Sequence, residues 1–347
     1  MNEAILAIVL KLTLALTADA EATLIFAGDA MMHQAQIDAA RTSTGGYDYS
    51  GCFVPVRHIV EDADYAVVNL ETPLGKNRFT GYPCFNAPVS YAEALKEAGF
   101  DLFLTANNHT LDRRDAGLHH TITALDSLGV PHIGTYHDAS SRQKNVPFVT
   151  TVKGFKIGFL NYTYGTNGIP VQKEAVVDYI DRDKIAADVK AAREAGAELI
   201  VCCMHWGNEY ELLPASSQKS LAEFLKSQGV ELIIGGHPHV VQPYRMFTDT
   251  VSGRRGAVVY SLGNFISNMK TRDTRGGALA CVKLRRDSIG TAVVDTVRYE
   301  LVYTVPPSGR QRNFVVYPID SVPAQWRQSA SAFRSALKNS FEHPRLK

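Results

Sequence analysis

The sequence predicts an α/β protein built as a two-sheet sandwich flanked by helices. Apolar runs of strand length alternate with amphipathic segments of helix length, which is the pattern of βαβ units. Several of the apolar runs lack polar alternation, as do strands that are buried on both faces of a parallel sheet. With 347 residues and 45% hydrophobic content, the chain is long enough to bury the core of such a sandwich.

The expected parallel strands and their helices run through the first two thirds of the chain. The apolar, strand-like runs are 24–28, 66–70, 102–106, 131–134, 199–204 and 230–234. The helices expected between them are 91–98, 115–128, 183–195 and 215–228. Each of these helices is followed by a glycine, which is typical of a helix C-terminus.

Antiparallel structure is expected at two further places. Residues 146–152 and 156–160 flank a short turn that contains Gly154, so they are predicted to form a hairpin. The segments 257–262, 278–284 and 293–305 alternate in polarity, and we expect them to form a second sheet.

Three parts are expected along the chain. Residues 1–22 form an apolar N-terminal segment, residues 23–305 form the main domain, and residues 306–347 form a C-terminal extension that is helical from about 324 to 339.

Polar residues suited to metal binding follow five of the strand-like runs. They are Asp29, Glu71, Asn108, His205 and the pair His237 and His239. Open α/β sheets bind ligands at the carboxyl ends of their strands, and carboxylate, imidazole and amide oxygen together suit a borderline divalent metal. Each residue alone could instead cap a following helix or turn. That alternative explains any one of them but not all of them at one edge of one sheet, so we predict a metal site there.

The candidate ligands lie in a series of short motifs, at 26–29, 69–74, 105–109, 205–210, 236–240 and 260–265. The order of these motifs resembles the calcineurin-like metallophosphoesterase superfamily, and most closely its divergent branch, the CapA (PgsA) family of poly-γ-glutamate capsule proteins. The resemblance implies a calcineurin-like metallophosphatase fold. It also implies a role in the synthesis, export or processing of poly-γ-glutamate or another envelope polymer.

The resemblance also implies a ligand set for one or two divalent ions, expected to be Mn, Fe or Zn. One ion would be held by Asn108, His205 and His237, and the other by Asp29 and His239, with Glu71 between them. Two departures matter here. Met31 stands where the superfamily pattern Asp-x-His places an imidazole, and a Glu replaces the usual bridging Asp. His33 is either a substitute donor or a surface histidine, and a single tightly bound metal is an open alternative.

The residues beside these ligands suggest acid–base chemistry. His109 matches the superfamily's proton donor to the leaving group, and Asp112 is placed to orient that imidazole. The alternative for His109 is a histidine at a helix start without a role. Glu209 and Tyr210 follow the His205 segment and are expected to contact substrate, unless they belong to an ordinary solvated loop.

Charge and motif content leave two classes of function open. The chain has 36 basic and 35 acidic residues, and this balance argues against nucleic acid as the main partner. We expect an anionic polymer, a peptide or a phosphoester as substrate, and the resemblance adds other capsule-synthesis components as partners. The first hypothesis is a metal-dependent, phosphoesterase-like or polymer-processing hydrolase. The second is a non-catalytic polymer-binding or assembly component with a structural or degenerate metal site.

The N-terminal segment predicts an exported protein. Residues 1–16 are mainly apolar, and small-x-small cleavage patterns follow at 18–20 and 20–22, as in a secretion signal. The resemblance to an envelope-associated family favours a periplasmic or envelope location. Glu3 and Lys11 keep open an amphipathic helix packed on a cytoplasmic domain. The run falls short of the roughly 20 residues of a spanning helix, so no transmembrane span is expected in the mature chain.

The chain has five cysteines without metal-binding spacing. Cys202 and Cys203 lie within an apolar run, where cysteine behaves as a small hydrophobic residue. In an exported protein, Cys52 and Cys84 could form a disulfide, and the sequence leaves this open.

Overall fold

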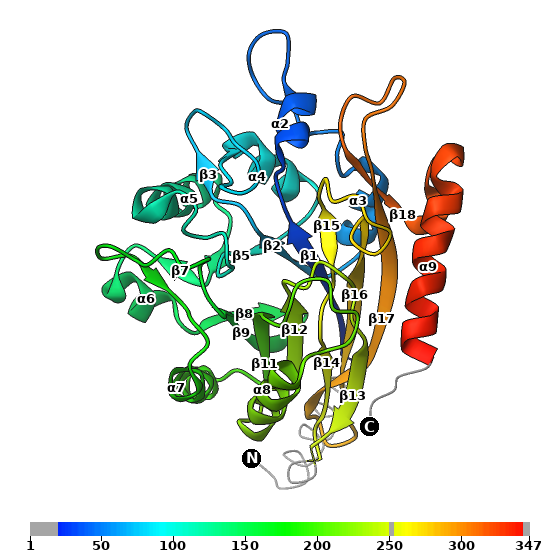
Figure 1. Cartoon of the computed structure of the whole chain (residues 1–347). Helices are drawn as coiled ribbons and strands as arrows, with labels where there is room; N and C mark the ends of the chain where they lie inside the picture. Colours follow the sequence, from blue (N-terminus) through cyan, green and yellow to red (C-terminus); the bar gives the residue numbers. More distant parts are fainter. Residues whose placement is uncertain (1–19, 250–252, 343–347) are drawn as a thin grey trace, which may run out of the picture.

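The computed structural model describes residues 20–249 and 253–342 and shows two β-sheets packed face to face (Figure 1). In spatial order, the first sheet contains β18 (Val315–Pro318), β17 (Ala292–Val305), β16 (Gly276–Arg286), β1 (Glu21–Ala30), β2 (Tyr65–Leu70), β5 (Leu102–Leu104) and β6 (His132–Ile133), with β15 (Asn264–Ile266) paired to β1. The second contains β13 (Tyr244–Thr248), β14 (Arg255–Val259), β12 (Leu232–Gly236), β11 (Leu199–His205), β9 (Phe155–Thr163) and β8 (Phe148–Val152). Two short pairs lie outside these sheets, namely β3 (Leu74–Gly75) with β4 (Ala87–Pro88) and β7 (Thr135–Tyr136) with β10 (Val176–Val177).

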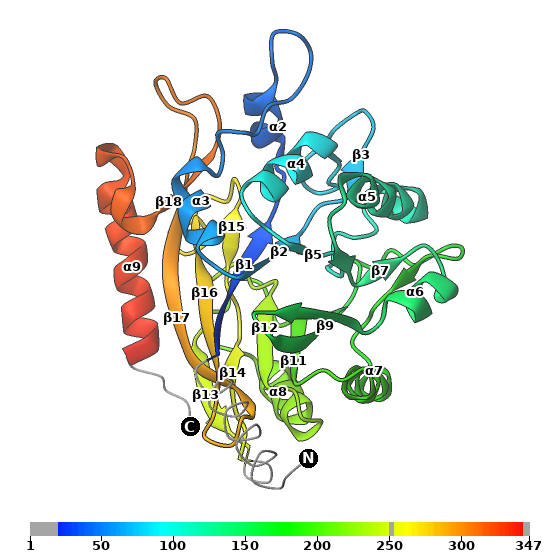
Figure 2. The same ribbon diagram turned by 180° about the vertical axis from the view of Figure 1, so that it is seen from behind.

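Helices cover the outer faces of both sheets. Those packed on the first sheet are α2 (Gln34–Ala40), α3 (Val54–Glu61), α4 (Val89–Glu97) and α5 (Arg114–Leu128). Those packed on the second are α7 (Arg182–Glu194) and α8 (Ser216–Ser227), while α6 (Ala139–Asn145) lies nearer the surface. The chain ends with η1 (Ile319–Ser321), η2 (Ala324–Trp326) and α9 (Arg327–Glu342). Both views place α9 alongside β17 and β18 (Figures 1 and 2).

Alternation along the central strands builds the layers. In β1, Leu24 and Phe26 point into the core between the two sheets, whereas Ile25 and Ala27 point into the core beneath the helices. In β11, Val201 faces the core between the sheets in the same way. Because both faces of these strands are buried, apolar residues are favoured at every position. This explains why the sequence shows continuous apolar runs there.

The predicted fold class is confirmed, as are most of its elements. The predicted helices 91–98, 115–128, 183–195 and 215–228 correspond to α4, α5, α7 and α8 within two residues at each end. The predicted hairpin is the antiparallel pair β8 and β9. In the C-terminal extension, β18 joins the first sheet before α9 begins.

The prediction of a separate second sheet from 257–262, 278–284 and 293–305 is wrong. β14 pairs in parallel with β12 in the second sheet. β16 and β17 instead extend the first sheet, with Cys281 of β16 opposite Ile25 of β1 in antiparallel register. Alternation shows which residues of a strand share a face, but it does not show which strand lies beside it.

The strand ends that carry the candidate ligands belong to two sheets, which corrects the prediction that they lie at one edge of one sheet. β1, β2 and β5 are parallel neighbours in the first sheet, and β11 and β12 are parallel neighbours in the second. The two sets of carboxyl ends meet, since the backbone N–H of His237 donates to Asp29 Oδ2 at 3.2 Å.

The N-terminal segment was predicted to be a secretion signal. The proposed signal segment falls on residues 1–22, and residues 1–19 of it lie outside the described residues. In the described part of the chain, no helix is long and apolar enough to cross a membrane.

All five cysteines lie in the described part of the chain and are free, so the structure contains no Cys52–Cys84 disulfide.

Candidate metal centre

The six predicted metal ligands come together where the strand ends of the two sheets meet. All of them are at most 3% exposed, and they are Asp29, Glu71 and Asn108 from the first sheet and its loops, and His205, His237 and His239 from the second. Asn108 Oδ1 lies 2.9 Å from His205 Nε2, and His239 Nδ1 lies 3.2 Å from Asp29 Oδ2. The sequence therefore brings carboxylate, amide and imidazole groups from distant segments into one buried cluster.

Glu71 lies at the centre of this cluster. Its Oε1 atom is 3.8 Å from His205 Nε2 and 3.8 Å from His239 Nε2. Asp29, Glu71 and His205 each offer one ligand atom such that the three atoms lie within 4.8 Å of one another. The carboxylate of Glu71 is thus placed between His205 and His239, where a bridging ligand is expected.

Two buried polar atoms of the cluster have no hydrogen-bond partner among the described residues. They are Oε1 of Glu71 and Nδ1 of His237. Leaving a buried polar atom without a partner costs about 1–3 kcal/mol, so such atoms usually have a ligand, a water or an ion. Both residues belong to candidate ligand groups, and a bound cation would satisfy these atoms.

Amide side chains hold the carboxylates in place. Asn69 Nδ2 donates to Asp29 Oδ1 at 2.8 Å and lies 3.4 Å from both Glu71 Oε2 and His205 Nδ1. Asn264 Oδ1 lies 3.0 Å from His239 Nδ1, so it can accept the proton of that nitrogen and leave Nε2 free. These contacts fix the orientation of ligands on both sheets.

Two glycines allow the strand ends to approach each other. A Cβ atom at Gly28 would lie 2.0 Å from the carbonyl oxygen of Gly263, which is far inside van der Waals contact. A Cβ at Gly236 would lie 2.8 Å from Asp29 Oδ1. The glycines are therefore required because the backbones and the ligand carboxylate are too close for any side chain.

The electrostatics of the cluster follow from its burial. Burial and then the neighbouring His237 lower the pKa of His205 well below its usual range, and burial and His239 lower that of His237 to about 3. Burial alone would raise the pKa of Asp29, but the hydrogen bond and charge of His239 outweigh it, and the pKa falls. Burial and the charge of Asp29 raise the pKa of Glu71 well above its usual range. His205 and His237 are thus held neutral, which is the form that binds metal.

His109 and Asp112 form a hydrogen-bonded pair beside the cluster. His109 Nδ1 lies 2.8 Å from Asp112 Oδ2, and both residues are buried. The ring of Phe85 packs edge-on against His109, with 4.5 Å between ring centroids, and the Phe85 N–H donates to Asp112 Oδ2. Asn167 reaches the same place, with Nδ2 3.5 Å from His109 Nδ1. The imidazole is therefore oriented by Asp112 and confined by an aromatic ring.

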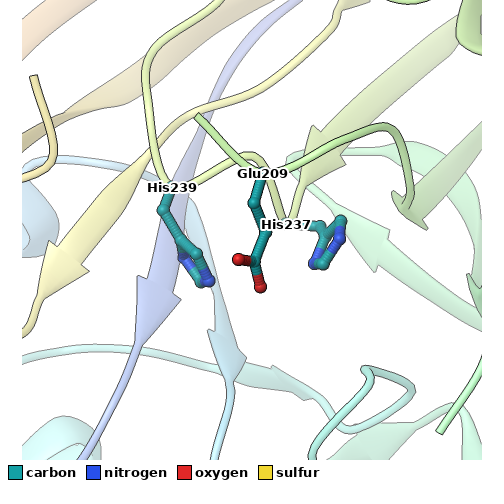
Figure 3. Close-up of side chains that lie close together, drawn as sticks. All are labelled: Glu209, His237 and His239. Atoms are coloured by element: carbon teal, nitrogen blue, oxygen red, sulfur yellow. The ribbon is translucent and has the colours of Figure 1, made fainter. Parts of the chain in front are cut away.

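Glu209 and Tyr210 lie at the exposed side of the cluster. Figure 3 shows the Glu209 carboxylate between the rings of His237 and His239, and ligand atoms of these three residues lie within 4.8 Å of one another. Tyr210 is 55% exposed, with its ring 6.3 Å from that of His239. Tyr164, also exposed, packs 4.5 Å from His237.

Several residues of the cluster were not predicted as site residues. Asn69, Asn264, Asn167 and Tyr164 all contact predicted ligands or His109. Asn69 had a readable signal, because a polar residue inside an apolar strand two positions before Glu71 shares its face of the strand. His33 is not a member of the cluster's candidate ligand groups. It is half-buried, and its Nδ1 lies 3.3 Å from Gln36 Oε1.

Comparison with known proteins gives similarities to capsule proteins. The model of the family described as "Bacterial capsule synthesis protein PGA_cap" matches residues 23–269. The "Capsule biosynthesis protein CapA" of Bacillus anthracis is 28% identical over 288 residues, covering 79% of this chain and 66% of that protein. The "PGA biosynthesis protein CapA" of Bacillus subtilis is 25% identical over 272 residues, covering 76% and 68%. The chain thus spans about two thirds of the length of these relatives.

A solved structure shows the same fold. The NAD nucleotidase NadN of Haemophilus influenzae superposes with a TM-score of 0.51 at 12% sequence identity, covering 92% of this chain and 56% of that one. At this identity the likeness concerns the fold alone.

Proposed function

The chain belongs to the bacterial capsule synthesis protein family, and on this premise we propose that it is a metal-dependent, hydrolase-like protein of envelope-polymer synthesis, export or processing. The names of its relatives support a poly-γ-glutamate polymer, since one is called a PGA biosynthesis protein and another a capsule biosynthesis protein. The single observation that carries the catalytic part is the buried His109–Asp112 pair, which lies next in sequence to the candidate ligand Asn108.

The residues present fit a divalent cation. The donor set combines carboxylate, imidazole and amide oxygen, which suits Mn, Fe or Zn. The unpartnered Oε1 of Glu71 and Nδ1 of His237 support a cation in the cluster independently of any resemblance. Asn108, His205 and His237 would hold one ion, Asp29 and His239 the other, and Glu71 would lie between them. Bound in this way, a divalent ion supplies a water of lowered pKa and polarises the bond to be cleaved.

The protein's own acid–base group is His109. Because its Nδ1 faces Asp112, the other ring nitrogen, Nε2, is the atom available to give a proton to a leaving group. Asp112 accepts the Nδ1 proton, so Nε2 would give its proton from the doubly protonated ring, which the Asp112 carboxylate would stabilise. Phe85 covers the pair and limits the access of water to it. These roles apply equally to a phosphoester and to an amide or γ-glutamyl bond, since each reaction must protonate its leaving group.

A second function is favoured by one observation, the methionine at position 31. Met31 is 1% exposed and stands where the superfamily pattern places a metal-binding imidazole. A polymer-binding or assembly component with a structural metal needs no open coordination position and no proton donor. The His109–Asp112 pair argues for the enzyme, because a structural site has no use for an oriented imidazole beside it.

The proposed function is tested by metal content and turnover measured on the same preparations. Metal per chain is determined by elemental mass spectrometry for wild type and His205→Ala, and hydrolysis is followed with bis-p-nitrophenyl phosphate and with γ-glutamyl oligopeptides. We expect metal in the wild type, loss of metal in the variant, and metal-dependent hydrolysis of one substrate class. If the wild type binds metal but hydrolyses neither substrate class, the assembly component is favoured. No metal after reconstitution with Mn²⁺, Fe²⁺ or Zn²⁺ would refute the metal site.

A further inference from the structure

One metal position of the proposed site has fewer protein ligands than the other. Asp29 and His239 define it, and Met31 offers only a thioether, which is a poor ligand for Mn²⁺ or Zn²⁺. His33 belongs to neither candidate ligand group of the described residues, and its Nδ1 accepts the backbone N–H of Asn268 at 3.3 Å and lies close to Gln36. A further ligand for this position must therefore come from another segment.

The loop after β11 brings a carboxylate to His239, one of the two residues of this position, and to the neighbouring His237. The ligand atoms of Glu209, His237 and His239 lie within 4.8 Å of one another, and the carboxylate lies between the two rings (Figure 3). Ligand bonds of roughly 2.0–2.2 Å place neighbouring ligand atoms about 3.3 Å apart. Glu209 is exposed, so its side chain can move the remaining distance without disturbing the core.

The backbone of this loop is fixed to the segment that carries the histidines. The Tyr210 N–H donates to the carbonyl oxygen of Pro238 at 2.8 Å, and the Trp206 N–H donates to that of Gly236 at 3.2 Å. These bonds flank Glu209 on both sides. Tyr210 and His237 also adopt positive φ angles of 68° and 97°, which are unfavourable for residues with side chains and are enriched at functional sites. Glu209 is thus held over the histidine pair by its own backbone.

Charge balance favours the same assignment. The two positions together hold up to four positive charges, and Asp29 and Glu71 supply two negative charges. A third carboxylate on the open side lowers the net charge of an occupied site to one. Burying uncompensated charge is costly, so this compensation stabilises a second ion.

Resting on the metal site of the proposed function, we infer that Glu209 is a metal ligand of the Asp29–His239 position and takes the place of the absent imidazole. Glu209 was predicted as a substrate-binding residue, and this assignment gives it a different role. The first position, with Asn108, His205 and His237, does not depend on it.

The test is the metal-binding stoichiometry of chelator-treated protein, measured with Mn²⁺ by isothermal titration calorimetry. Wild type is compared with Glu209→Gln and with the matched control Glu211→Gln. Glu211 is an exposed residue of the same loop, and its carboxylate accepts a hydrogen bond from Asn208. We expect two equivalents in the wild type and the control. In Glu209→Gln, one site should keep its affinity and the other should weaken roughly 10–100-fold or be lost.

Two results would overturn the inference alone. One is an unchanged isotherm for Glu209→Gln. The other is a wild type that binds a single equivalent, lost in His205→Ala and kept in Glu209→Gln, which contradicts the role of Glu209 but leaves the proposed metal site standing. Absence of Mn²⁺ binding in every protein would refute the metal site and the inference together. Because the readout is metal bound, it needs no active substrate.

Discussion

His109 Nδ1 and Asp112 Oδ2 lie 2.8 Å apart in a buried environment, three residues apart in the chain and next to the candidate ligand Asn108. The contact commits one ring nitrogen of His109 to the carboxylate. The opposite nitrogen is then available for proton transfer, as in other oriented imidazoles of hydrolases.

Replacing Asp112 with Asn should lower kcat by roughly 10²–10⁴-fold with little change in KM, because the amide no longer selects the productive tautomer of His109. Metal content should stay unchanged. Steady-state kinetics on the substrate class identified in the screen, with metal analysis of the same sample, measure both quantities. Asp126→Asn, an exposed carboxylate on α5, is the control. Equal turnover in Asp112→Asn and Asp126→Asn would remove the pair from the mechanism.

Replacing Gly236 with Ala should weaken metal binding, because the new methyl group would lie 2.8 Å from Asp29 Oδ1 and push that carboxylate aside. We expect a destabilisation of about 1–3 kcal/mol from overpacking and a loss of metal affinity of roughly tenfold or more. Calorimetric metal titration and chemical denaturation provide the two measurements. Gly165→Ala is the control, since a Cβ at Gly165 meets nothing within 4 Å. A Gly236→Ala protein with wild-type metal affinity would show that Asp29 is not a ligand.

Asn264 supports His239 by accepting a hydrogen bond from it, and its loss should be felt at the metal. Asn264→Ala should reduce metal affinity about 10–100-fold, whereas Asn264→Asp keeps an acceptor and should retain affinity. Both variants lose the donor to the Thr274 carbonyl oxygen, so both should lose stability to a similar degree. Competition with a fluorescent chelator measures affinity. Equal metal affinity in Ala and Asp variants would contradict the orienting role.

His33 should contribute to the pH dependence of the stability of the metal-free protein. Burial lowers its pKa from 6.5 to about 4, against the opposing hydrogen bond of Gln36. Between these values the unfolded chain binds a proton that the folded chain does not, so the free energy of unfolding falls as the pH decreases from 6.5 to 4. At pH 4, His33 lowers the free energy of unfolding by about 3 kcal/mol relative to neutral pH. Urea denaturation of wild type and His33→Gln at pH 7 and pH 4.5 should show a smaller loss in the variant. An identical loss in both proteins would exclude His33 as its source.

The sequence was informative about strands that are buried on both faces and about the residues that end them. Asp29, Glu71, His205 and His237 could be read as a group because each follows a continuous apolar run. The sheet to which each strand belongs could not be read, since β14 and β16 were expected in one sheet but join different sheets. Pairing depends on contacts distant in sequence, which a local pattern does not encode.

The position of Glu209 could not be predicted for a related reason. It depends on the loop after β11, where Gly207 and Tyr210 have positive φ angles, and on His237 after β12, which also has one; only the glycine signals this in the sequence. The hydrogen bond from Tyr210 to Pro238 then folds the loop back over the histidines. Asn264 lies in the segment 260–265 that carries the resemblance, but its role was not predicted, because its contact with His239 arises only when β15 pairs beside β1.

The division of the ligands between two sheets has a consequence for folding. Asp29, Glu71 and Asn108 come from one half of the sandwich, and the histidine ligands come from the other, so neither half alone can chelate an ion. An ion that binds only the assembled halves acts as a cross-link between them, and at a free concentration 100 times its Kd it adds about 2.7 kcal/mol to their association. Cellular supply of the metal would then govern how long the folded protein persists, in addition to its chemistry.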